Sequence, residues 1–124
     1  MARTLAKSTL KRFRKMLEAE RERLVGVIEE IEEEQERLRL SETSSERSPD
    51  PNTAEGGSLA FEIEKELSLH RNATDLLSQA EQALERLGDG TYGICVECGS
   101  AIPVARLEAI PYTKLCVKCS AARH

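Results

Sequence analysis

The 124-residue sequence predicts a mostly α-helical fold, in which a long antiparallel coiled-coil hairpin precedes a small C-terminal module held by a metal ion. Two stretches carry apolar residues at alternating three- and four-residue spacing, which is the coiled-coil pattern. A segment rich in Ser, Pro and Gly separates them, and four cysteines follow as two Cys-x-x-Cys pairs. We therefore expect a hairpin domain over residues 1–87 and a four-cysteine domain over residues 88–124.

Composition limits the size of the core. Charged residues make up 32% of the chain, which holds only two Phe, two Tyr and no Trp. Long helices with a narrow buried seam are therefore expected. In the small C-terminal module, a metal ion is expected to take the place of a hydrophobic core. The net charge of −4 is uneven, because residues 3–15 contain six basic residues and no acid, whereas residues 29–36 contain six Glu and no base.

Two helices are expected, at about residues 8–40 and 59–87. The first seam comprises Leu17, Arg21, Leu24, Ile28, Ile31, Gln35 and Leu38, and the second comprises Ile63, Leu67, His70, Ala73, Leu77, Ala80, Leu84 and Leu87. Ser58 can cap the start of the second helix, and Gly88 can end it in the left-handed conformation. Neither stripe stabilises a helix alone, so the seams are expected to pair, within one chain or between two.

Residues 41–58, SETSSERSPDPNTAEGGS, are expected to form the loop at the tip of the hairpin. Pro49, Pro51, Gly56 and Gly57 oppose a continuous helix. A connection of this length between two helices is either a functional loop or a disordered one. The Pro-Asp-Pro-Asn stretch favours a local turn, because each Pro fixes its φ angle and the Asp and Asn side chains can bond the nearby backbone.

The two cysteine pairs, Cys95/Cys98 and Cys116/Cys119, are separated by seventeen residues. This spacing is typical of a tetrahedral four-thiolate Zn²⁺ site with bonds of about 2.3 Å, and such a site leaves no open coordination position. We therefore expect one structural zinc ion. Disulfides and a redox dithiol are the alternatives, but the first thirteen residues lack the apolar run of a signal peptide or membrane span, so a cytoplasmic protein with reduced thiols is expected.

Residues around the cysteines are expected to support the metal. Gly99 stands where a cysteine loop commonly needs a positive φ angle. An apolar shell is expected from Ile94, Ile102, Val104, Leu107, Ile110 and Leu115. Arg106, Lys114 and Lys118 can offset the negative charge of four thiolates. No catalytic constellation is present, since the sequence has no Gly-rich phosphate loop and the four thiols are assigned to one ion, so no enzyme is expected. His70 is interpreted as a partly buried structural residue.

The run from Gly90 to Cys119, GTYGICVECGSAIPVARLEAIPYTKLCVKC, combines a Gly-Thr-Tyr-Gly lead, C-x2-C-G, Arg-Leu-x-Ala-x-Pro and C-x2-C. It resembles the signature of the DksA/TraR family of bacterial zinc-finger transcription factors, and the preceding hairpin is similar to the family in order and length. The resemblance implies a regulator that binds RNA polymerase directly, not promoter DNA. It implies that the zinc end seats at the rim of the secondary channel, and that the tip approaches the active site. A guanosine tetraphosphate alarmone is an implied partner.

The resemblance also implies partner-binding residues at the tip, where family members carry a D-x-x-D-x-A motif. The corresponding residues here are Asp50, Asn52, Thr53, Ala54 and Glu55, so Thr53 replaces the second aspartate and Ala54 is shifted by one position. The alternative function is a nucleic-acid-binding zinc module, suggested by Arg106, Lys114, Lys118 and the basic first helix. The acidic total and the few aromatic residues count against this alternative, and no membrane partner is expected.

Overall fold

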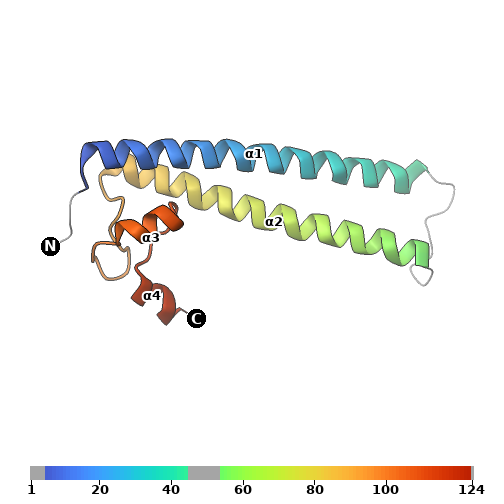
Figure 1. Cartoon of the computed structure of the whole chain (residues 1–124). Coiled ribbons are helices and arrows are strands. Elements are labelled where there is room, and N and C mark those ends of the chain that lie inside the picture. Colours follow the sequence, from blue (N-terminus) through green and yellow to red (C-terminus); the bar gives the residue numbers. More distant parts are fainter. Residues whose placement is uncertain (1–4, 45–53, 124) are drawn as a thin grey trace. The chain divides into compact units, whose positions relative to one another are not determined.

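The structure, a computed structural model, describes residues 5–44 and 54–123 (Figure 1). These residues form four helices, α1 (Lys7–Ser44), α2 (Ala54–Asp89), α3 (Val104–Ala109) and α4 (Val117–Ala122). A single antiparallel bridge between Ile94 and Ala101 lies in the segment that joins α2 to α3. The predicted mostly helical class with two long helices is confirmed. Across the described ranges, every helix is too short or too polar to cross a bilayer.

The chain packs as two compact units, which we call the terminal unit and the central unit. The terminal unit comprises Met1–Glu22 and Leu77–His124, and the central unit comprises Arg23–Leu76. Each unit contains one part of α1 and one part of α2. Within each unit these two parts lie side by side and run in opposite directions, as the expected antiparallel hairpin requires (Figure 1).

The central unit buries a narrow seam. Leu24, Ile28 and Ile31 of α1 and Ala73 of α2 are all buried, in agreement with the predicted stripes. Other predicted seam residues are not buried. Leu67 of the central unit is 46% exposed, and Arg21 of the terminal unit is also exposed. The narrow seam explains how a chain with so few aromatic residues can still pair two long helices.

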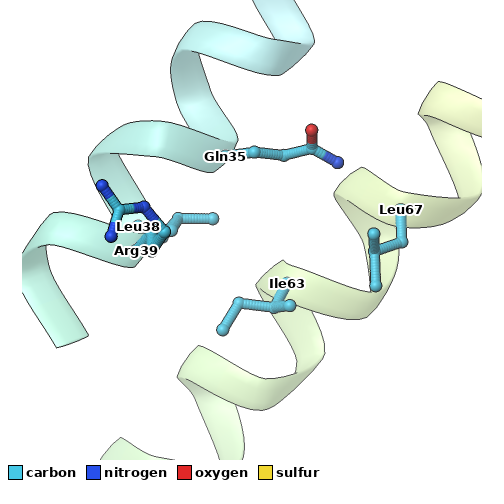
Figure 2. A pocket seen from close by; sticks show the side chains of 5 residues that line it. All are labelled: Gln35, Leu38, Arg39, Ile63 and Leu67. Carbon is cyan, nitrogen blue, oxygen red and sulfur yellow. The ribbon is translucent and has the colours of Figure 1, made fainter. Parts of the chain in front are cut away.

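A hollow of about 250 Å³ interrupts this seam, lined by Gln35, Leu38, Arg39, Ile63 and Leu67. Figure 2 shows the side chains of Gln35 and Ile63 extending from the two helices into the space between them. The amide of Gln35 is poorly suited to a dry apolar contact. The polar interruption predicted at Gln35 therefore coincides with the place where the seam is incompletely filled.

His70 lies on the central unit's seam with its side chain 32% exposed, and its Nε2 is 3.5 Å from Oε1 of Glu32. Its predicted position, partly buried on the seam, agrees with this exposure. The sequence did not identify Glu32 as its neighbour, because a pair across two helices depends on their relative register, which neither stripe specifies alone.

The helix ends differ from the prediction. Helix α1 continues to Ser44, and α2 begins at Ala54, so both helices extend into the predicted 41–58 loop. Gly56 and Gly57 lie inside α2, because a glycine costs a helix only about 1 kcal/mol relative to alanine. The prediction that Ser58 caps this helix is wrong, since Ser58 is the fifth residue of α2.

The predicted end of α2 at Gly88 is also wrong. The helix continues to Asp89, and the left-handed residue is Gly90, whose φ angle is 78°. The Thr91 N–H then donates to the Arg86 carbonyl at 3.0 Å, which is the long hydrogen bond of a Schellman motif. Either glycine could end a helix, and the one followed by this hydrogen bond does so.

The terminal unit has one continuous hydrophobic core to which the helices and the C-terminal segment both contribute. Phe13 and Tyr92 meet in it with ring centroids 5.7 Å apart. Its buried members are Phe13 and Leu17 of α1, Ala80, Ala83 and Leu87 of α2, and Tyr92, Cys95, Ile102 and Leu107 of the C-terminal segment. The metal-binding region is therefore packed directly on the helices.

We expect Phe13→Ala to lower the free energy of unfolding by about 3–5 kcal/mol, because truncation of a buried aromatic ring leaves a cavity. The chain's other phenylalanine, Phe61, is 67% exposed and provides the matched control. Phe61→Ala should change the free energy of unfolding by less than about 0.5 kcal/mol. Urea denaturation followed by circular dichroism measures both values, and equal losses in the two variants would contradict this core.

Candidate metal centre

The four cysteine Sγ atoms all lie within 4.8 Å of one another. The Sγ atoms of Cys98 and Cys116 are 3.8 Å apart, far beyond a disulfide bond of about 2.05 Å. All four cysteines are free thiols. Zinc–sulfur bonds of about 2.3 Å give a tetrahedron whose edges are about 3.8 Å. The sulfur arrangement therefore fits a four-thiolate zinc ion, and no other metal-type cluster occurs among residues 5–44 and 54–123.

The first cysteine pair is shaped by a tight backbone turn. The Gly99 N–H donates to the Cys95 carbonyl at 2.9 Å, and the Cys95 N–H donates to the Ser100 carbonyl at 2.8 Å. Gly99 has a φ angle of 74°, which confirms the prediction for this position. Because side chains disfavour a positive φ, glycine at this position allows the chain to turn after Cys98, so that the Ser100 carbonyl reaches the Cys95 N–H.

The second pair is placed by the start of a helix. Cys116 caps α4, where its Sγ accepts a hydrogen bond from the Cys119 N–H at 3.5 Å. The two cysteine segments are joined directly, since the Val96 N–H donates to the Lys114 carbonyl at 3.0 Å. Backbone hydrogen bonds thus hold both pairs in place around the same point.

Arg106 supports the second pair through the backbone. Its Nε donates to the Leu115 carbonyl at 3.0 Å, immediately before Cys116. Lys114 and Lys118 have exposed side chains, and within the described part of the chain neither side chain makes an ion pair or side-chain hydrogen bond. Of the three predicted basic residues, Arg106 alone is thus seen to position a cysteine segment.

The thiols influence one another's protonation. Burial raises the pKa of the Cys95 thiol, but backbone hydrogen bonds from Cys98, Cys116 and Glu97 together outweigh it and lower this pKa to about 6. The neighbouring sulfurs, Cys116 foremost, raise the pKa of Cys119 to about 12. A thiol with its pKa raised this far stays protonated at neutral pH, and a divalent metal bound by the sulfurs would supply the charge that favours its thiolate.

Part of the predicted apolar shell belongs to the terminal core. Ile102 and Leu107 are fully buried, and Val104 and Leu115 pack against the same cluster. Ile94 and Ile110 are half-buried. The sequence did not identify Tyr92 as a core residue, although its hydroxyl donates to the Pro111 carbonyl at 2.7 Å. Burial raises the pKa of this tyrosine to about 12, so the donor stays protonated.

Two ion pairs add to the terminal unit. Arg12 Nη2 of α1 lies 2.9 Å from Glu108 Oε1 of α3. Arg123, just after α4, pairs with Glu97 of the first cysteine loop. Both pairs link segments distant in sequence, and for this reason no local pattern predicted them. Exposed pairs of this kind contribute little stability individually, so they serve mainly to fix orientation.

Of the five predicted tip residues, the structure describes two. Asp50, Asn52 and Thr53 lie outside the described residues, as does His124. Ala54 and Glu55 form the first two positions of α2.

Comparison with known proteins identifies the family. The profile of the prokaryotic DksA/TraR C4-type zinc finger matches residues 90–123. An uncharacterized protein of Aquifex aeolicus is 35% identical over 92% of this chain and 75% of its own length. The RNA polymerase-binding transcription factor DksA of Caulobacter vibrioides is 34% identical over 84% of this chain and 72% of its own. Both of these alignments are too long to cover the cysteine module alone, so they also include much of the hairpin.

The fold agrees with this sequence relationship. The solved structure of transcription factor DksA2 from Pseudomonas aeruginosa is similar with a TM-score of 0.77 and 28% identity, covering 94% of this chain and 84% of that one. The chain therefore belongs to the DksA/TraR family of C4-type zinc-finger proteins. Its cofactor is accordingly one structural zinc ion.

We expect Cys98→Ser to reduce bound zinc well below one per chain, because a neutral hydroxyl replaces one of four thiolates. Most of the helical circular dichroism should remain, since the central unit has its own buried seam. Val96→Ser, at an exposed position of the same loop, introduces the same residue and should leave the zinc content unchanged. Elemental analysis of the purified proteins gives the zinc content, and full occupancy in Cys98→Ser would contradict the four-thiolate site.

Proposed function

We propose that this protein is an RNA polymerase-binding transcription regulator of the DksA type. The observation that carries the proposal is that the likeness to DksA proteins extends over both the hairpin and the cysteine module, covering 84% of the chain in one relative and 94% in a solved structure. A zinc module shared by unrelated proteins would match at its cysteines alone. A protein that acts on this enzyme works in the cytoplasm, and it needs no catalytic residues of its own.

The proposed zinc ligands are Cys95, Cys98, Cys116 and Cys119, supported by the mutual closeness of their sulfurs. When bound, zinc supplies folding free energy and four fixed bonds, and its filled coordination shell leaves no position for a catalytic water. Cys95 is 1% exposed and belongs to the same core as Phe13 and Leu17. Formation of the metal site is thereby coupled to packing of the helices, so zinc stabilises the entire terminal unit.

The proposed division of labour follows the two predicted domains, residues 1–87 and 88–124. The zinc end docks on the polymerase, and the hairpin enters the secondary channel. Asp50, Asn52, Thr53, Ala54 and Glu55 then act near the catalytic centre. Thr53 cannot supply a carboxylate, so the negative charges available in this segment come from Asp50 and Glu55.

Binding to purified RNA polymerase core tests the proposal. The full-length zinc-loaded protein should be retained by immobilised core enzyme without any DNA. Free duplex DNA and single-stranded RNA provide the comparison, because a nucleic-acid-binding module would bind them with a steep dependence on salt. If the protein fails to bind the core enzyme and instead binds nucleic acid in a salt-dependent way, the proposed function is wrong. A nucleic-acid-binding zinc module is then the better interpretation.

We expect Asp50→Ala to leave affinity for the polymerase within about twofold and to change transcript yield in vitro, because a tip residue acts after docking. Glu62→Ala removes one negative charge from an exposed position of α2 and serves as the control. Quantitative binding and single-round transcription with the same preparations separate the two effects. Weaker binding with unaltered output per bound complex would place Asp50 in docking instead.

A further inference from the structure

Four basic side chains gather on one solvent-exposed face at the start of α1. Lys7, Lys11, Arg14 and Lys15 are spaced as i, i+4, i+7 and i+8, which places them on one side of a helix. All four are exposed, while Phe13 and Leu17 of the same turns are buried in the terminal core. We call these four residues the basic face.

The basic face takes no part in ion pairing among the described residues. Considering residues 5–44 and 54–123, none of its four members forms an ion pair or side-chain hydrogen bond. The neighbouring Arg12 differs, because it pairs with Glu108 at 2.9 Å and its guanidinium lies 5.0 Å from the Phe13 ring centroid.

The position of the basic face also opposes helix stability. The N-terminal end of a helix carries partial positive charge, so acidic side chains stabilise the first turn and basic ones destabilise it. The first turn of α1 contains no acid and begins with Lys7. A sequence selected for stability alone would place glutamates here. The uncompensated charge is therefore better explained by a partner of opposite sign.

We propose that the basic face docks on a carboxylate-rich protein surface of RNA polymerase. The inference rests on the proposed function and adds the surface through which the terminal unit binds. The observations favour a protein partner over nucleic acid, since the four cations of the basic face can neutralise at most about four phosphates.

Charge reversal tests this surface. The double variant Lys7→Glu/Lys11→Glu should lower affinity for the core polymerase by about tenfold or more at low ionic strength, mainly through slower association, and the loss should shrink as salt is raised. Its melting temperature should stay unchanged or rise, because glutamate complements the helix dipole. A rise in stability together with a loss of binding cannot come from misfolding.

A control variant distinguishes local charge from total charge. Lys65→Glu/Arg71→Glu makes the same change in net charge on exposed positions of α2, outside the terminal unit, and should lower affinity much less than reversal at the basic face; equal losses would contradict the inference. If both double variants bind polymerase as the unmodified protein does, the inference is wrong and the proposed function stands. If the unmodified protein binds no polymerase, both the inference and the proposed function are wrong. Loss of DNA or RNA binding on reversal, with polymerase binding unaffected, would assign the basic face to nucleic acid and overturn the inference.

Discussion

The terminal unit depends on a single shared core in which a metal-site cysteine is also a hydrophobic residue. Cys95 is buried among Phe13, Leu17 and Leu107, so the sulfur cluster and the helix packing are parts of one structure. A C-terminal segment with two six-residue helices and one bridge has too little apolar surface to fold by itself. The metal ion and the adjoining parts of α1 and α2 therefore stabilise this segment jointly.

Because the metal site and the core form one structure, small polar interactions of the terminal unit also hold the segments near the cysteines. Arg106 holds the backbone before Cys116, and the Tyr92 hydroxyl holds Pro111, so each fixes a segment between the two cysteine pairs. Such contacts contribute modestly to stability on their own. Together they fix the positions of the two backbone segments that lead to Cys116.

Sequence reasoning predicted the features encoded locally and missed those set by register. The four cysteines, Gly99 and the buried seam residues Leu24, Ile28 and Ile31 follow from spacing alone. Phe13 and Ala83 in the core, and Glu32 beside His70, depend on how two helices align, which neither stripe specifies. The helix ends were misjudged at Ser58 and Gly88, because helical context overrides the preferences of single glycine and serine residues.

One zinc ion in the cysteine module and binding to RNA polymerase are together what the structure and the proposed function require. Native mass spectrometry of the full chain mixed with core polymerase tests both parts in one spectrum. We expect a complex with one copy of this protein, whose mass when released includes one zinc ion bound to four thiolates. A chain carrying disulfides and no zinc, or a spectrum without any complex under conditions where the polymerase remains intact, would contradict this expectation.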